Sequence, residues 1–236
     1  MSPLLALVLG LLLLVPALLV AIPVHEMGHA AAAYFLGDRS VRYFGYFSPD
    51  PRRFLDPMGG LAVFIALVGW GRRVPVQSNR ISTTGQKVLF ELGGPAANLL
   101  VALILGFLLR ALLRAGLPIS FDLGPGLLLE ALYAIVFLNL SIFAFQLLPI
   151  PGLDGWNIIE VLFRNRNARF FYDVSVRRRE IWAGLVVILL AFQFLQGTNL
   201  LNYVMAPFFE PASLISVGGC IGYRIPGLTG LFPCLL

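Results

Sequence analysis

The only two histidines of the sequence, His25 and His29, lie in one His-Glu-x-x-His motif that also contains Glu26. On a helix, positions four residues apart lie on the same face, so both imidazoles can point at one metal ion. Glu26 is then placed to take a proton from a water molecule on that metal. A structural polar cluster is the alternative, but two histidines and a glutamate within an apolar run indicate a functional site.

A catalytic zinc site has three protein ligands and one open position for water. No third histidine exists, so the third ligand must be Asp, Glu or Cys, and Asp154 is the best candidate. Prolines and glycines precede it, so the chain can present the carboxylate on irregular backbone that lines a cavity. The residues alone leave Asp56 and Asp38 as rivals, although we expect a turn residue at Asp56 and a solvated helix-end residue at Asp38.

Composition places these residues in a membrane. Hydrophobic residues make up 58% of the chain and charged residues 12%, and the mean hydropathy is +0.86. A soluble domain has about 25% charged residues, so we expect an integral membrane protein. The net charge is +5, but the arginines lie in short loops between apolar runs, as in cytoplasmic membrane loops. This placement argues against nucleic acid as a partner.

The apolar runs predict an all-α polytopic membrane protein. A spanning helix needs about 20 apolar residues, and a run of about 10–14 is more often re-entrant, which makes 57–70 the doubtful one. The first run has no basic residues before it and no convincing cleavage site, so we expect a retained helix, kinked at Pro16 and Pro23, and not a signal peptide. The runs are 3–36, 57–70, 88–109, 126–148, 180–196 and, more weakly, 198–218.

Charge placement predicts the side of the membrane on which the site lies. If 57–70 dips in and returns, the loops 38–56, 71–87 and 149–179 share one face that holds nearly all the arginines. If 57–70 spans, the arginines divide more evenly and the positive-inside asymmetry nearly vanishes. The re-entrant arrangement also brings the histidines and Asp154 to the same face. We therefore expect a multi-pass protein of the cell membrane with the site towards the cytoplasmic side.

Other polar segments have more ordinary interpretations. The stretch 41–47 has β-branched and aromatic residues in partial alternation, which predicts a short strand or hairpin at the membrane face. Glu91 and Glu130 lie near helix starts, where the helix dipole favours acids, so we interpret them as caps. The triplet Arg177–Arg179 is typical of a topology signal that contacts anionic headgroups.

A stretch of small residues precedes an asparagine in the run 88–109. Gly93, Gly94 and Ala97 predict close helix packing more than binding. Asn98 either helps to organise the site or bonds between helices, and the residues alone leave both interpretations open.

Three separated motifs carry a resemblance to a known family. They are His-Glu-x-x-His at 25–29, Gly-Pro-x-x-Asn at 94–98 and Pro-x-Pro-x-x-Asp-Gly at 149–155. In this order they resemble the site-2 proteases, which are intramembrane zinc metalloproteases, in a compact form without an appended soluble domain. The match covers roughly residues 20–160. It implies a core of three helices and identifies Asp154 as the third zinc ligand.

The resemblance implies an activity and its residues. The expected reaction is hydrolysis of peptide bonds in or near transmembrane segments of other membrane proteins, with Zn²⁺ held by His25, His29 and Asp154. Glu26 would be the catalytic base. The family usually has Asn before Leu-Leu-Pro, where this chain has Gln146. An amide there would hold substrate or stabilise the oxyanion, which makes Gln146 a candidate together with Asn98.

Two units and two alternative functions complete these expectations. We expect a catalytic membrane core at 1–163 and a basic loop with C-terminal membrane segments at 164–236. The partners would be a transmembrane protein substrate and the lipid bilayer, and the sequence predicts no oligomeric state. A metal-transporting membrane protein would explain the ligands but not Glu26. A non-catalytic relative that retains the zinc site is the other alternative, and Gln146 favours it.

Overall fold

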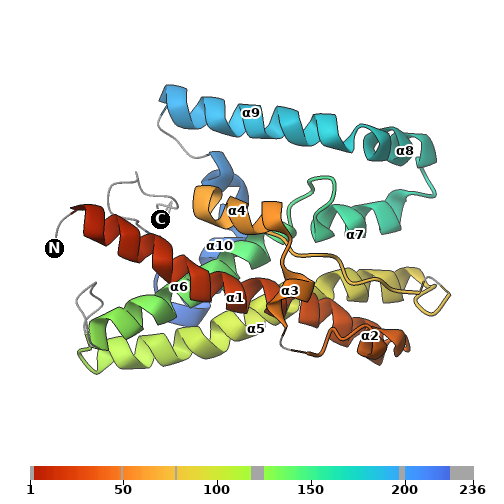
Figure 1. Cartoon of the computed structure of the whole chain (residues 1–236). Helices are drawn as coiled ribbons and strands as arrows, with labels where there is room; N and C mark the ends of the chain where they lie inside the picture. Colours follow the sequence, from red (N-terminus) through yellow and green to blue (C-terminus); the bar gives the residue numbers. More distant parts are fainter. Residues whose placement is uncertain (1–2, 49, 78, 118–124, 197–199, 224–236) are drawn as a thin grey trace.

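The computed structural model describes residues 3–48, 50–77, 79–117, 125–196 and 200–223, which form helices joined by turns and extended segments (Figure 1). These residues contain isolated β-bridges but no strand of a sheet. The helices are α1 Pro3–Phe35, α2 Ser40–Tyr43, α3 Pro51–Phe54, α4 Pro57–Ala66, α5 Thr84–Arg114, α6 Pro125–Gln146, α7 Asp154–Phe163, α8 Ala168–Val176, α9 Arg178–Gln196 and α10 Leu200–Val217.

Four of the described helices are long and apolar enough to cross a membrane. They contain the segments Leu7–Phe35 of α1, Thr84–Arg114 of α5, Gly126–Gln146 of α6 and Leu200–Val217 of α10. α1, α5 and α6 pack against one another, and α10 packs against α5 and α6. The protein is therefore a multi-pass membrane protein with an all-helical bundle, as the apolar runs predict.

The surface of α5 shows why this bundle needs lipid around it. Leu100, Ile104 and Phe107 lie on one face at helical spacing, and each is at least half exposed.

The first turn of α5 is fixed by a capping box, in which Thr83 accepts from the backbone N–H of Gln86 and the Gln86 side chain accepts from the N–H of Thr83.

Small residues let α1 and α5 approach closely beside the motif. A Cβ placed on Gly93 would lie 2.7 Å from the carbonyl oxygen of Gly28 and 2.8 Å from the Cβ of Ala32. A Cβ on Gly28 would in turn lie 2.6 Å from the Cβ of Ala97. Neither backbone can withdraw without moving a whole helix, so the predicted close packing at Gly93 and Ala97 is confirmed.

The doubtful run 57–70 forms a short helix, α4. Asp56 caps it by accepting from the backbone N–H groups of Met58 and Gly59, both at 3.0 Å, and Leu67 ends it in the left-handed conformation. Its ten residues are about 15 Å long, which is half of the hydrocarbon thickness. The helix is too short to span, and Asp56 is a capping residue.

The strand predicted over 41–47 is wrong. Residues 40–43 form α2, and turns follow it, with the N–H of Phe44 bonded to Ser40 and that of Tyr46 bonded to Val41. Val41 is fully buried, so this segment places one apolar side chain in the core at helical geometry instead of alternating between two faces. Local strand propensity is overridden by this packing.

Asp38 is at a helix end, as expected, but it is buried and not solvated. Its carboxylate accepts from the hydroxyl of Ser40 at 2.6 Å and from the backbone N–H of Gln77 at 2.7 Å. Burial by itself raises the pKa of this carboxyl, but these hydrogen bonds outweigh burial and hold the pKa below its ordinary value. Asp38 therefore ties the segment that returns from α4 to the end of α1.

We predict opposite effects from two alanine substitutions in α5. Gly93→Ala places a Cβ against the backbone of Gly28 and should destabilise the protein, whereas Gly85 has open space around it. Gly85→Ala should be neutral or stabilise by up to about 1 kcal/mol, because alanine has the higher helix propensity. Thermal unfolding of both variants in the same detergent measures the difference, and equal midpoints would contradict the close contact.

Candidate metal centre

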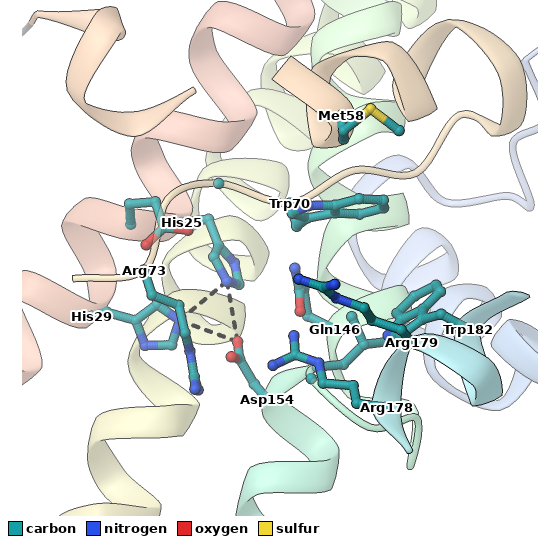
Figure 2. Close-up of a pocket in the computed structure, with 14 residues that line it drawn as sticks. His25, His29, Met58, Trp70, Arg73, Gln146, Asp154, Arg178, Arg179 and Trp182 are labelled. Carbon is teal, nitrogen blue, oxygen red and sulfur yellow. Dashed lines mark hydrogen bonds and ion pairs between the residues drawn. The ribbon is translucent and has the colours of Figure 1, made fainter. Parts of the chain in front are cut away.

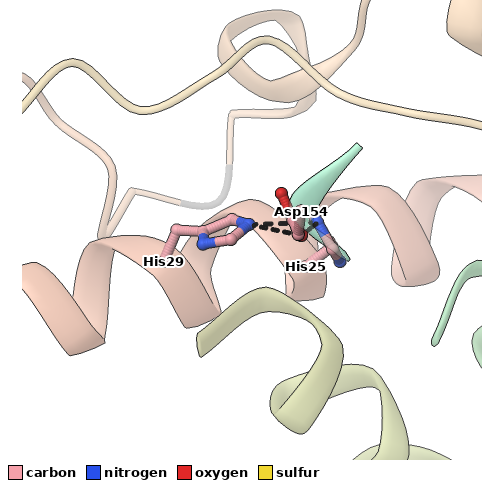
Figure 3. Close-up of side chains that lie close together, drawn as sticks. All are labelled: His25, His29 and Asp154. Carbon is pink, nitrogen blue, oxygen red and sulfur yellow. Dashed lines mark hydrogen bonds and ion pairs between the residues drawn. The ribbon is translucent and has the colours of Figure 1, made fainter. Parts of the chain in front are cut away.

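Three side chains from two distant parts of the chain meet beside the bundle (Figure 3). His25 and His29 project from α1, and Asp154 is the first residue of α7. The His25 Nε2, His29 Nε2 and Asp154 Oδ2 atoms form a triangle whose three edges are each 3.1 Å. All three residues are at least 95% buried. They form the group of described residues that could hold a metal ion.

The turn between α6 and α7 delivers the carboxylate to this place. Gly152 has φ +102°, a conformation that suits glycine, and the N–H of Leu153 bonds back to Ile150. Gly155 lies against the backbone of Leu147, where a Cβ would lie 2.8 Å from the Leu148 carbonyl oxygen. The Pro- and Gly-rich stretch therefore folds into a tight turn that points Asp154 back towards α1.

The hydrogen bonds on the far side of each imidazole fix which nitrogen faces the triangle. His25 Nδ1 lies 2.7 Å from Asn98 Oδ1, and His29 Nδ1 lies 2.8 Å from the carbonyl oxygen of Phe90. Both oxygens only accept, so each Nδ1 carries the proton and each neutral imidazole turns an unprotonated Nε2 to the centre. Asn98 is itself oriented, because its amide donates to Ala21 O and Asn139 Oδ1.

The donor set fits zinc. Ligands at about 2.0–2.1 Å from a tetrahedral zinc lie roughly 3.3 Å apart, close to the 3.1 Å edges of the triangle. Gly94 lies beneath both imidazoles, where a Cβ would be 2.6 Å from His25 Cε1, so Gly94 serves this site and not the helix packing alone. Glu26 is 3% exposed, and its Oε2 has no hydrogen-bond partner. That free oxygen is available for a proton.

A cavity of about 750 Å³ opens beside the three side chains (Figure 2). Gln146 lines it and donates weakly, at 3.4 Å, to the carbonyl of Gly69. Asn98 lies behind His25 and does not line the cavity. The sequence suggested both Asn98 and Gln146 as residues that contact the substrate. Only Gln146 lies where it can reach a substrate in this cavity. The other described side chains that line the cavity include Met58, Trp70, Arg73, Arg178, Arg179 and Trp182.

Sequence reasoning missed one ion-pair network beside the centre. Glu91, interpreted as a helix cap, lies a full two turns inside α5, and its Oε2 accepts from Arg73 at 2.8 Å and from Asn157 at 3.0 Å. This carboxylate joins α5, α7 and the segment after α4 around the site. The apolar run starts at 88, which made Glu91 look like a residue of the first turn, but α5 begins at Thr84.

We predict that Asn98 controls metal affinity through His25. Asn98→Ala removes the oxygen that orients the imidazole, and losses of about 10–100-fold in metal affinity are typical of such changes. Asn98→Asp keeps an acceptor at the same place and should retain more affinity than the alanine variant. Competition with a chromophoric zinc chelator measures both, and equal affinities for the alanine variant and the wild type would contradict this role.

Comparisons with known proteins agree with this centre. The chain is 38% identical over 152 residues to "Putative zinc metalloprotease YwhC" of Bacillus subtilis, a match that covers 63% of this chain and 68% of that protein. It is 36% identical over 158 residues to "Putative zinc metalloprotease Rip2" of Mycobacterium tuberculosis, covering 64% and 57% of the two chains. The protein of the same name from Mycolicibacterium smegmatis is 31% identical over 185 residues, covering 76% and 66%.

No protein-family model and no solved structure matches the chain. The similarity to the Bacillus protein is sufficient to assign the family, because it extends over two thirds of that protein. The names of these relatives and the His25, His29 and Asp154 group together identify zinc as the metal. The chain belongs to the site-2 protease family of zinc metalloproteases.

Proposed function

We propose that this protein is an intramembrane zinc metalloprotease that hydrolyses peptide bonds in or near transmembrane segments of other membrane proteins. The observation that carries the proposal is the position of the centre on a helix that is long and apolar enough to cross a membrane. His25 lies ten residues before the end of the apolar segment Leu7–Phe35, or about 15 Å along the helix. A hydrolytic centre within such a segment is suited to a substrate that itself lies in the membrane.

The ligands and the base have separate roles in this proposal. His25, His29 and Asp154 hold zinc, which polarises the scissile carbonyl and lowers the pKa of the attacking water when it is bound. Glu26 takes the proton of that water on its unpartnered Oε2 and passes it to the leaving amine. Asn98 and the carbonyl of Phe90 keep both imidazoles in the tautomer that binds metal.

Gln146 is the candidate for contact with the substrate. It lines the cavity, and its single hydrogen bond to Gly69 is long, so the amide can exchange that partner for a peptide group. A longer side chain than the family's asparagine reaches further into the cavity. We propose that it holds the scissile peptide or stabilises the oxyanion.

Arginine placement supports a cytoplasmic orientation of the centre. The ends of α1 and α6 and the start of α5 meet at one end of the bundle, as the contacts of Asp154 with the histidines and of Asn157 with Glu91 require. The loops at this end hold most arginines of the chain. By the positive-inside rule we place this end in the cytoplasm, in a multi-pass protein of the cell membrane.

We predict that Glu26→Gln and Asp154→Ala separate metal binding from catalysis. Glu26→Gln keeps the three ligands and should retain near-stoichiometric zinc, but it removes the proton acceptor and should abolish cleavage. Asp154→Ala removes a ligand and should lose zinc and activity together. Elemental analysis measures zinc in the purified variants, and mass spectrometry of model transmembrane peptides measures cleavage.

Two outcomes would contradict the proposal. Wild-type protein that binds zinc but cleaves no peptide, together with zinc transport that survives Glu26→Gln, would indicate a metal-transporting protein. Cleavage that appears only in Gln146→Asn would indicate a non-catalytic relative with a retained zinc site.

A further inference from the structure

Two arginines at the start of α9 point into the cavity that holds the metal centre (Figure 2). Arg178 and Arg179 belong to the triplet that the sequence suggested as a topology signal. Their neighbour Arg177 does not line the cavity. Both arginines lie beyond residue 163, where we expected the catalytic core to end. Their side chains nevertheless form part of the wall of the cavity. Their position indicates more than a contact with headgroups.

The contacts of α9 hold this first turn at the cavity. Trp182 donates its indole N–H to the carbonyl oxygen of Pro151 at 2.7 Å, and its ring lies 5.8 Å from that of Trp70. The guanidinium of Arg178 lies against Gly152, where a Cβ would be 2.6 Å from Arg178 Nε. Gly152 is two residues before Asp154, so Arg178 is placed by the same turn that delivers the carboxylate.

The charges around the cavity leave an excess of positive charge on this wall. Arg73, the third arginine that lines it, pairs with Glu91 at 2.8 Å. Among the described residues, no ion pair is formed by Arg178 or Arg179. The acids that line the cavity, Glu26 and Asp154, offset the charge of a bound divalent zinc. The two guanidinium groups therefore remain without a counter-charge.

The position of these arginines in the helix strengthens the attraction for an anion. The first turn of a helix carries positive partial charge, so arginines there are unfavourable unless an anion approaches. The same turn contains one acid, Glu180, but two arginines in succession still depart from the usual preference for acids, and such departures occur at functional sites. A carboxylate is the anion that guanidinium groups bind best in a peptide, through paired N–H donors.

We propose that Arg178 and Arg179 bind a carboxylate of the substrate next to the scissile peptide bond. They are then specificity-determining residues, and this inference rests on the proposed protease function. The carboxylate has two chemical sources: an Asp or Glu side chain beside the cleavage site, or the free C-terminus of a membrane peptide. An anionic lipid headgroup is a different partner, and the test distinguishes it.

Three peptides test the proposal and separate the two sources. Each has about 20 apolar residues with a helix-breaking Gly-Gly pair. The first has Glu beside this pair and an amidated C-terminus, the second has Gln and an amidated C-terminus, and the third has Gln and a free carboxylate shortly after the pair. Cleavage is measured in a zwitterionic detergent with wild type, with Arg178→Gln/Arg179→Gln and with the matched control Arg177→Gln.

Wild type and Arg177→Gln should cleave a carboxylate-bearing peptide about five- to tenfold faster than the neutral one, as two partly exposed ion pairs allow. The double variant should lose this preference and cleave all three peptides at similar rates. The preference should also shrink as the ionic strength rises. Faster cleavage of the first peptide identifies a side-chain carboxylate, and faster cleavage of the third identifies a C-terminal one.

A binding measurement keeps the inference independent of turnover. Zinc-loaded Glu26→Gln should bind the preferred carboxylate peptide about five- to tenfold more tightly than the neutral one, and the two arginine substitutions added to it should remove the difference. Peptide binding with this preference but no cleavage by wild type would contradict the proposed function and leave the arginine site standing.

Three results would overturn the arginine site. The first is an equal loss of cleavage of all three peptides in the double variant, which indicates a structural or transition-state role. The second is the same loss in Arg177→Gln, which indicates a general surface charge. The third is an effect of the double variant that appears only in vesicles with anionic lipid, which assigns the arginines to headgroups.

Discussion

Three atoms with lone pairs, two imidazole nitrogens and a carboxylate oxygen, lie 3.1 Å from one another in a buried place, and the rest of the site depends on this arrangement. With both Nδ1 protons committed to Asn98 and Phe90, no proton remains to join the three acceptors. Protonating both imidazoles would place two cations side by side. A divalent cation relieves the repulsion, because all three lone pairs can then point at positive charge.

The surrounding helices meet requirements that follow from this triangle. Two imidazoles on one face of α1 need room, which Gly94 provides, and a rigid neighbour, which the contact of Gly28 with Gly93 provides. Asn98 links α1, α5 and α6 through His25, Ala21 and Asn139. One asparagine therefore bonds between helices and also accepts from the imidazole of His25, so the two interpretations of Asn98 do not exclude each other.

Local signals in the sequence were sufficient for part of this account. Helical spacing places His25 and His29 on one face, and apolar length predicts α1, α5 and α6 as spanning helices. The weaker run 198–218 left its topology open, and it forms α10, which is long and apolar enough to span. The predicted strand at 41–47 failed, because burial of Val41 decides that segment and propensity does not.

Contacts between distant segments were beyond local signals. The rival ligands Asp38 and Asp56 could be set aside only once their hydrogen bonds to Gln77 and to the first turn of α4 were known. Glu91 and Arg178 were interpreted as ordinary charges for the same reason. Their partners, Arg73 and Gly152, are 18 and 26 positions away, and no periodicity connects them.

X-ray absorption at the zinc edge of the purified protein is the sharpest test of the three-ligand centre, because it reports the atoms bound to the metal. We predict two imidazole nitrogens, one carboxylate oxygen and one further oxygen ligand at about 2.0–2.2 Å from the zinc. Asp154→Ala should give almost no zinc-edge signal, because it loses the metal together with this ligand. A spectrum with sulfur ligands, with a single imidazole, or unchanged in Asp154→Ala would contradict this prediction.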